Sequence, residues 1–307
     1  MKISIIGAGN VGGLSGMRIA QEGLGEVYLI DVAKGLAQGK VLDMQDARAI
    51  LKYNYHIHGS EDITQIKDSH IIVVTAGLAR RPGMTREDLL TKNAQILKDI
   101  CLAIKKYAPE SLVVVVTNPL DLMTLFMFKS TGFKANRVLG MGVTLDASRF
   151  ANLISQDLNI PVIDINACVI GSHGEGMLPL PRFTTIKGVA LDEIMDDSKI
   201  DRLTQRTVDR GKEIVSLLGS GSAYFAPSAA IAEITRALAK NEKRTLGVSA
   251  YLNGEYGLKD VCLGVPCRLG KDGIEQIIEL DLNQQEKEAL LKSASTIKEQ
   301  YRAIANV

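Results

Sequence analysis

The sequence predicts an α/β fold in which a doubly wound parallel sheet is followed by an α+β half. Short apolar runs alternate with segments of helical periodicity in the first half, and this texture changes near Thr144. Runs that are apolar on consecutive residues are typical of strands buried on both faces, as in parallel sheets covered by helices. We therefore divide the chain into residues 1–143 and 144–307. Because no Gly/Ser linker separates the two halves, we expect one compact unit with the site between them.

Strand–helix units follow one another through residues 1–143. The apolar runs KISII, EVYLI, HIIVVT and LVVVVT predict strands at 2–6, 26–30, 70–75 and 112–117. Helical periodicity predicts helices at 11–22, 34–47 and 93–107. The repeated order of strand, helix and strand is the pattern of a doubly wound sheet.

Residues 144–307 mix helices and strands without that regular alternation. We expect helices at 144–157, 198–218, 226–239 and 284–304, and strands at 163–171, 183–188, 245–252 and 264–268. In the last of these helices, apolar residues recur at steps of three and four, which predicts one buried face. This half is therefore predicted to be α+β and to pack against the first.

Composition excludes several classes of function. The 307 residues are 46% hydrophobic, and 36 basic residues balance 35 acidic ones, which favours neither nucleic acid nor an anionic membrane as a partner. The initial MKISIIGAG lacks the long apolar stretch of a secretory signal. No apolar run of about 18 residues predicts a membrane span. Four scattered cysteines without zinc-ligand spacing suit reduced thiols in the cytoplasm.

A glycine-rich segment, GAGNVG, follows the first predicted strand and opens a helix. Gly7 permits a tight turn, Gly9 lets a pyrophosphate approach the backbone, and Gly12 lets helix and strand pack closely. The helix N-terminus adds free N–H groups and the positive end of its dipole. Asp31 stands nineteen residues after Gly12, where a carboxylate can bind both ribose hydroxyls and repel a 2′-phosphate. Residues 1–143 are therefore predicted to bind NAD rather than NADP; the alternative is a glycine turn with a helix-capping aspartate.

Asn118 follows the fourth predicted strand, in VTNP. In a doubly wound sheet, ligands lie beyond the carboxyl ends of the strands, so Asn118 can meet the nicotinamide side of the cofactor. A turn asparagine before Pro119 is the alternative interpretation.

Of the four histidines, His173 is the candidate for proton transfer. It stands between glycines in IGSHGEG, after an apolar run, where a loop lets the ring reach a ligand. Histidine is the side chain best suited to proton transfer near neutral pH. His56 and His58 alternate in YNYHIHG, which is typical of an edge strand, and no third ligand is near, so no metal site is predicted. His70 opens a strand and is interpreted as structural.

The segment LDASR supplies Asp146 and Arg149 at a spacing that puts both on one face of a helix. One interpretation is a surface ion pair, worth roughly a few tenths of a kcal/mol. In the other, the two side chains diverge, with Asp146 bonded to a histidine and Arg149 to a substrate carboxylate. The residues by themselves leave both open.

Together, these motifs resemble those of the NAD-dependent lactate/malate dehydrogenase family along essentially the whole chain. In order, they are GAGNVG, EVYLID, TAG with the arginine-rich RRPGMTR, VTNP, LDASR, IGSHGEG and GSAYFAP. The most similar members are malate dehydrogenases whose sequences look like lactate dehydrogenases. The resemblance implies a Rossmann domain, an α+β substrate domain, and a homodimer or homotetramer. It also implies NAD-dependent interconversion of (S)-malate and oxaloacetate, as in the tricarboxylic acid cycle.

The resemblance further implies roles for individual residues. His173 corresponds to the acid/base, and Asp146 would pair with it, fix its tautomer and favour the imidazolium. Arg149 would clamp the C1 carboxylate of the substrate with two hydrogen bonds. The residues implied to contact the cofactor are Gly7, Ala8, Gly9, Asn10, Val11, Gly12, Asp31, Asn93, Val116, Thr117 and Asn118. Asn118 would also touch the substrate.

Three arginines stand within the seven residues of RRPGMTR, around a Pro-Gly pair that suits a loop folding over a ligand. By resemblance, Arg80 lies at the position that selects the substrate and would bind the second carboxylate of malate or oxaloacetate. A lactate dehydrogenase commonly has a neutral glutamine there. Arg86 would polarise the carbonyl group and stabilise the charge that develops on its oxygen. Arg81 is expected to be solvated or salt-bridged.

The histidine loop departs from the family pattern at two positions. Close relatives often have an aspartate where Glu175 stands and a hydroxyl residue where Gly176 stands. These changes leave His173 in place but affect the expected hydrogen bonding of the loop. Ser222, in GSAYFAP, lies in a segment that the resemblance places on the substrate side.

Three other functions are compatible with parts of the pattern. A lactate dehydrogenase of relaxed selectivity is the nearest, and Arg80 argues against it. A non-catalytic NAD-binding protein would keep GAGNVG and Asp31 but would not need His173 or Asp146. An NAD-dependent glycosidase shares the nucleotide-binding fold but requires a metal, and no metal site is predicted.

Overall fold

A single large sheet organises the molecule. The structure, a computed structural model, describes residues 1–78, 86–305 and 307. Within these residues, 11 strands join in the order β3-β2-β1-β4-β5-β6-β12-β13-β8-β9, with β14 paired to β13. A second, three-stranded sheet has the order β11-β10-β7.

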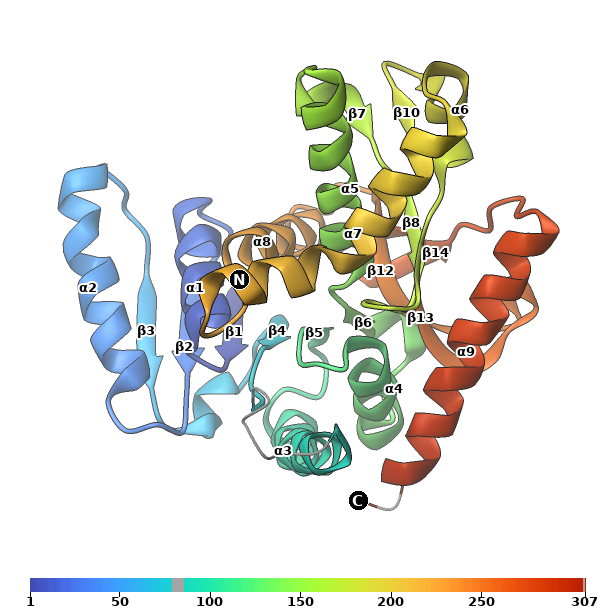
Figure 1. Cartoon of the computed structure of the whole chain (residues 1–307). Coiled ribbons are helices and arrows are strands. Elements are labelled where there is room, and N and C mark those ends of the chain that lie inside the picture. The colour runs from blue at the N-terminus through green and yellow to red at the C-terminus, as the bar shows by residue number, and fades with distance from the viewer. Residues whose placement is uncertain (79–85, 306) are drawn as a thin grey trace.

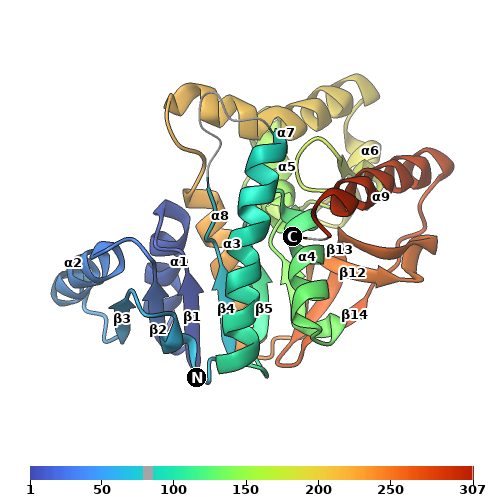
Figure 2. The same cartoon turned by 90° about the horizontal axis from the view of Figure 1, so that it is seen from below.

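The first six strands of the chain form the parallel part of the large sheet. They are β1 (Lys2–Ile6), β2 (Glu26–Ile30), β3 (Ile57–Ser60), β4 (Ile71–Val74), β5 (Leu112–Val115) and β6 (Val138–Gly140). Their order reverses between β1 and β4, which is the topological switch point of a doubly wound sheet. Figure 2 shows β3, β2, β1, β4 and β5 side by side. The predicted fold class is confirmed here in its first half.

Helices cover this sheet on both faces. They are α1 (Asn10–Gln21), α2 (Leu36–Leu51), α3 (Arg86–Tyr107) and α4 (Leu120–Thr131). In Figure 1, α1 lies above the central strands, whereas α3 and α4 lie below them. Because both faces are covered, every residue of β4 and of β5 is buried.

The second half of the chain extends the same sheet with antiparallel strands. Ser249 of β12 pairs with Gly140 of β6, so the sheet continues from one half into the other. The added strands are β8 (Val169–Gly171), β9 (Met177–Pro179), β12 (Arg244–Asn253), β13 (Lys259–Gly270) and β14 (Gly273–Ile277). The small sheet contains β7 (Ile165–Asn166), β10 (Thr185–Ile186) and β11 (Val189–Ala190). The division at residue 143 stays a prediction, because the large sheet runs through it.

The helices of this half are α5 (Val143–Leu158), α6 (Leu191–Ile194), α7 (Asp197–Leu218), α8 (Phe225–Ala239) and α9 (Gln284–Ile304). Short 3₁₀ turns span Ile63–Ile66, Ala135–Arg137, Val162–Asp164, Pro181–Phe183 and Glu255–Gly257. Helix α8 packs back on α1, where Arg18 Nε donates to Ser228 Oγ at 3.0 Å (Figure 1). The two halves therefore form one unit, as the lack of a linker predicts.

Several predicted elements differ from the structure. Helix α4 and strand β6 were not predicted. Most residues of α4 are buried, and its apolar residues lie on more than one face, so its sequence carries no one-sided period. The predicted strand 163–171 is instead two short strands, β7 and β8, which belong to different sheets. Helix α3 begins at Arg86 rather than at residue 93. Its first turns were not predicted because most of their residues are polar and exposed.

Candidate active site

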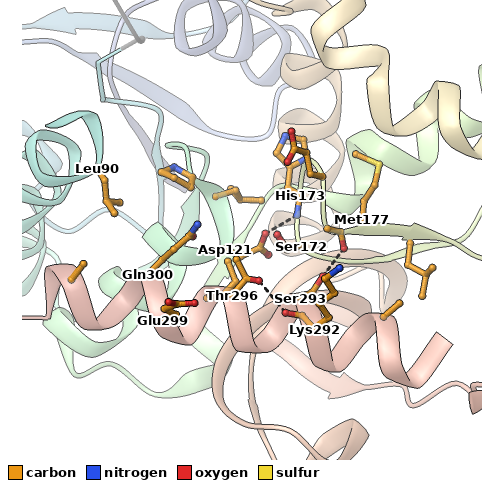
Figure 3. A pocket seen from close by; sticks show the side chains of 18 of the residues that line it. Leu90, Asp121, Ser172, His173, Met177, Lys292, Ser293, Thr296, Glu299 and Gln300 are labelled. Carbon is orange, nitrogen blue, oxygen red and sulfur yellow. Dashed lines mark hydrogen bonds between the residues drawn. The ribbon is translucent and has the colours of Figure 1, made fainter. Parts of the chain in front are cut away.

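A cleft of about 1090 Å³ opens beside the carboxyl edge of the parallel strands. Its walls come from the start of α3, the start of α4, the loop after β8 and one face of α9. Figure 3 shows Leu90, Asp121, His173 and Ser293, which come from these four segments, around the same space. The fold therefore brings His173 to the edge of the sheet where ligands of doubly wound proteins bind.

The imidazole of His173 is held by a buried carboxylate. His173 Nδ1 lies 2.8 Å from Asp146 Oδ2, and the Asp146 side chain is 0% exposed. A carboxylate can only accept, so the proton is on Nδ1 and Nε2 is left for a ligand. Asp146 reaches this position from the first turn of α5, whereas His173 comes from the loop between β8 and β9.

Burial and charge act on the His173 ring in opposite directions. Burial by itself lowers the pKa of His173, but the charge of Asp146 and its hydrogen bond outweigh burial, and the net pKa is raised. The charge of Asp121 adds to the rise, whereas Arg149 opposes it. The arrangement therefore favours an imidazolium that can give up a proton near neutral pH.

Arg149 lies next to the same carboxylate but is not fully paired by it. Its Nη1 is 3.5 Å from Asp146 Oδ1, which is a weak contact. Its Nε is buried and has no hydrogen-bond partner among the residues that the structure describes. Burial also lowers the pKa of this guanidinium. The predicted i, i+3 ion pair between Arg149 and Asp146 is therefore present, but it is not on the surface, because the Asp146 side chain is fully buried. The unpaired N–H group of Arg149 suits an anionic ligand.

The glycine turn has the geometry that a dinucleotide requires. Gly7 has φ +108°, a conformation that favours glycine. A Cβ atom at Gly12 would lie 1.9 Å from the Gly7 carbonyl oxygen, so only glycine fits against the turn. A Cβ at Gly9 would meet nothing within 4 Å, which leaves open space beside the backbone. Helix α1 starts at Asn10, so its N-terminus faces this space.

Asp31 and Lys40 both bond to the backbone of this turn. Asp31 Oδ2 accepts a hydrogen bond from the Ala8 amide at 2.6 Å, and its Oδ1 accepts from the Ala33 amide at 2.9 Å. Lys40 Nζ donates to the Gly9 carbonyl oxygen at 3.0 Å. The turn is thus bordered by the predicted carboxylate and by a cation that sequence reasoning missed.

Of the predicted asparagines, Asn93 holds the neighbouring loops together. Asn93 is buried in α3; its Oδ1 accepts from the Leu78 amide at 2.8 Å, and its Nδ2 donates to the Asn118 carbonyl oxygen at 3.0 Å. Asn118 is exposed beyond β5, and the Asn118–Pro119 bond is cis. Thr117 is buried and bonds through Oγ1 to the Ala76 carbonyl oxygen at 2.6 Å. Asn93 thus connects two loops at the edge of the sheet, and its contact with a cofactor stays a prediction.

Only part of the arginine-rich segment belongs to the residues that the structure describes. Arg80 and Arg81 lie outside the described residues. Arg86 is the first residue of α3, but its side chain also lies outside what the structure describes. The predicted roles of Arg80 and Arg86 therefore rest on the sequence.

The two unusual residues of the histidine loop have specific neighbours. Glu175 Oε1 lies 3.1 Å from Lys212 Nζ of α7. The Gly176 carbonyl oxygen accepts a hydrogen bond from Ser293 Oγ of α9 at 2.7 Å (Figure 3). A Cβ at position 176 would lie 2.6 Å from that Oγ, so Ser293 fills the space that a side chain there would need. The loop is therefore attached to α7 and α9.

The remaining histidines and the cysteines do not line the cleft. His58, in edge strand β3, bonds to Glu26 at 2.9 Å and stacks on Tyr28. His70 Nδ1 accepts a hydrogen bond from the Lys2 amide at 3.2 Å. Three of the four cysteines are buried, and all four are free. Across residues 1–78, 86–305 and 307, no three His, Cys, Asp or Glu side chains are grouped so as to hold a metal ion. Ser222 is exposed in the turn before α8.

Asp121 is a second site residue that sequence reasoning missed. It lines the cleft from the first turn of α4, and its Oδ2 accepts a hydrogen bond from the His173 backbone amide at 2.7 Å (Figure 3). The available signal was its position three residues after Asn118, at the carboxyl edge of a buried strand. Since the sequence does not predict α4, it does not place Asp121 at the site.

Comparison with known proteins agrees with this geometry. A family model described as the lactate/malate dehydrogenase NAD binding domain matches residues 1–140. A second model, for the alpha/beta C-terminal domain of the same enzymes, matches residues 143–307. The chain belongs to the lactate/malate dehydrogenase family.

Both malate dehydrogenases and lactate dehydrogenases of the family are similar to this dehydrogenase. A malate dehydrogenase of Methanosarcina barkeri is 48% identical over 297 residues, with 97% of each chain covered. The apo malate dehydrogenase of Picrophilus torridus superimposes with a TM-score of 0.96 at 39% identity, covering 99% of this chain and 97% of that one. A lactate dehydrogenase of Cryptosporidium parvum, solved with lactic acid and NAD, gives a TM-score of 0.95 at 35% identity and covers 100% of this chain and 98% of its own.

Family membership confirms three predictions. The resemblance is real, the fold is a Rossmann domain with an α/β carboxyl-terminal half, and the cofactor of this oxidoreductase is NAD. Within the described residues, none of this dehydrogenase's helices has the length and apolar character that crossing a bilayer requires. Since the family includes enzymes named for lactate and for malate, the substrate depends on individual residues of the site.

Proposed function

We propose that the protein is a malate dehydrogenase, which reversibly oxidises (S)-malate to oxaloacetate with NAD. One observation carries the proposed type of reaction, the oxidation of a hydroxy acid: His173 is bonded to buried Asp146, and the incompletely paired guanidinium of Arg149 lies beside the same carboxylate. An acid/base and an anion-binding group are thus adjacent at the cofactor edge of the sheet.

The residues of the first half fit NAD. The open backbone at Gly9 and the start of α1 would receive the pyrophosphate, and Asp31 has a carboxylate at the end of β2 for the ribose hydroxyls. The exposed loop at Asn118, with Val116 and Thr117 before it, would border the nicotinamide. When bound, NAD supplies or accepts the hydride; the residues of the chain orient the substrate and move the proton.

In the reduction of oxaloacetate, protonated His173 gives its Nε2 proton to the keto oxygen, and Asp146 stabilises the charged ring before transfer. In the oxidation of malate, neutral His173 takes the hydroxyl proton. Arg149 holds the C1 carboxylate, for which its planar N–H groups are suited. Arg86 would stabilise the negative charge that develops on the reacting oxygen.

Preference for malate over lactate rests on Arg80. The diacid has a second carboxylate that needs its own cation, whereas pyruvate presents a methyl group at that point. A desolvated arginine facing a methyl group would be unpaired, and mismatches of this type discriminate by about 10⁴. The 48% identity to a relative named malate dehydrogenase supports the same choice.

An assay of NADH oxidation tests the proposal. The purified protein is expected to oxidise NADH with oxaloacetate, in the presence of a chelator, and to be nearly inactive with pyruvate. Comparable rates with both keto acids would indicate a lactate dehydrogenase of relaxed selectivity. Inactivity with both, with NADH still bound, would indicate a non-catalytic NAD-binding protein, and loss of activity in chelator would indicate metal-dependent chemistry.

We also propose that the protein acts in the cytoplasm, in the tricarboxylic acid cycle, as a homodimer or homotetramer with no nucleic acid or membrane partner. Exposed apolar side chains on α2 and around the end of α7 support the assembly, because isolated monomers rarely expose several large apolar residues together. They are Leu42, Ile50, Leu51, Val215, Leu217 and Leu218. Light scattering on the purified protein measures its oligomeric state.

A further inference from the structure

Asp121 is a buried carboxylate next to His173 that the proposed reaction does not use. It is 2% exposed, in the first turn of α4. Its Oδ2 accepts from the His173 amide at 2.7 Å, and its Oδ1 accepts from Ser249 Oγ, also at 2.7 Å. Both carboxylate oxygens are therefore paired.

These contacts join three segments that are far apart in the sequence. Asp121 belongs to α4, Ser249 to β12, and His173 to the loop after β8. His173 is consequently held at two points, with Asp146 of α5 on its ring and Asp121 on its backbone. Figure 3 shows the contact with Asp121. Two anchors on one residue restrict both the path of the loop and the direction of the ring, which proton transfer requires.

A carboxylate is a costly group at such a position. Burial raises the pKa of Asp121 from its usual 3.8 to about 6, although hydrogen bonds from Ser249 and from the His173 amide lower it in part. Ionised Asp121 therefore disfavours folding relative to a neutral side chain of the same shape. Groups retained against such a cost are concentrated at functional sites.

We propose that Asp121 is a positioning residue for His173, which anchors its backbone and adds a second buried negative charge behind the imidazolium. The inference rests on His173 being the acid/base of the proposed function. Among the residues that the structure describes, the titratable groups that face Asp121 are His173 on its loop, Asp146 on α5 and the Cys262 thiol on β13. Ser249 is its hydroxyl donor from β12.

The Asp121→Asn variant separates charge from shape. An asparagine can still accept from the His173 amide and can donate to Ser249 Oγ, so the fold is expected to persist. Removal of the negative charge makes the protonated ring less favourable. We expect the midpoint of the His173 titration, followed by NMR of ¹³C-labelled histidine in the free protein, to fall by roughly 0.5 to 1.5 pH units. With only four histidines, comparison with His173→Asn assigns the signal.

Two further variants complete the test. Ser249→Ala removes the hydroxyl donor but leaves the carboxylate, so Asp121 holds its proton to a higher pH and carries less negative charge while His173 titrates. The His173 midpoint is therefore expected to fall, but by less than in Asp121→Asn. Asp260→Asn is the matched control, because Asp260 also connects α4 to the neighbouring strands, through Lys129 at 2.9 Å and Tyr251 at 2.7 Å, without touching His173. It is expected to leave the midpoint unchanged.

The activity of the same variants gives a second measurement. For oxaloacetate reduction, kcat of Asp121→Asn is expected to fall about tenfold at neutral pH with little change in KM, and kcat/KM should begin to fall at a lower pH than in the wild type.

An unchanged His173 midpoint in folded Asp121→Asn would overturn the proposal. If that variant did not fold, an unchanged His173 midpoint in Ser249→Ala would overturn it. Since the NMR titration needs no substrate, a shift in a protein inactive with oxaloacetate would retain the positioning role and reject the proposed function instead.

Discussion

Asp146 Oδ2 and His173 Nδ1 lie 2.8 Å apart, and no part of the Asp146 side chain is exposed. This pair decides how the site responds to pH. Burial alone would lower the pKa of His173, and the adjacent carboxylate reverses that effect, so the net pKa is raised.

Replacement of Asp146 by asparagine is expected to reverse the sign of this shift. Without the negative charge, burial dominates and the pKa of His173 falls. Oxaloacetate reduction uses the protonated ring, so its kcat/KM should decline at a lower pH than in the wild type. Malate oxidation uses the neutral ring, so its kcat/KM should rise at a lower pH than in the wild type. We also expect kcat to fall by about 10² to 10⁴, because an amide can select the wrong tautomer. pH–rate profiles in both directions measure these effects; profiles that coincide with the wild type would contradict them.

The His173→Asn variant is expected to keep NADH binding and to lose turnover by roughly 10² to 10⁴, the usual contribution of a positioned acid/base. NADH affinity is measured by fluorescence titration and turnover by NADH oxidation. His58→Asn is the matched control, since His58 lies in edge strand β3 and bonds to Glu26. Near-normal turnover in His173→Asn would show that another group moves the proton.

The Arg80→Gln variant is expected to shift preference from oxaloacetate toward pyruvate. The cation that pairs with the second carboxylate is removed, and the desolvation cost against a methyl group disappears with it. The ratio of kcat/KM for the two keto acids should change by about 10² or more. Arg81→Gln is the control, because the neighbouring arginine has no assigned role. If selectivity moved with Arg81 and not with Arg80, the wrong arginine has been named.

Lys40→Met is expected to weaken NADH binding by about 3- to 10-fold, the range for loss of one partly exposed charged contact. Lys40 Nζ lies 3.0 Å from the Gly9 carbonyl oxygen, beside the turn proposed to hold the pyrophosphate. Fluorescence titration at low and moderate salt measures the loss, which should be larger at low salt. Lys34→Met, in the exposed segment before α2, should leave the affinity unchanged. Equal affinities for Lys40→Met and the wild type would exclude this contact from the cofactor site.

The local spacing of apolar residues was sufficient to predict the helices that bury one face and the strands that bury both faces. Strands β1 and β2 and helix α9 have the predicted bounds, because apolar spacing along a short segment reports directly which faces are buried. Helix α4 was missed because most of its residues are buried, so its apolar residues do not mark a single face. The sequence also predicted the glycine turn, Asp31, Asn118, Asp146, Arg149 and His173 as a set, because each belongs to a recognisable motif.

The sequence by itself thus determined the fold class and the cofactor, and it predicted the types of residue in the site. Only the tertiary structure decided which of them touch. His173 is 27 residues from Asp146 and 52 from Asp121, and Ser249 is 128 residues from Asp121. Contacts over such separations depend on how the strands are ordered in the sheet and how α4, α5 and β12 meet beside it. The spacing of residues along the chain carries no information about these distances, whereas the packed core fixes them.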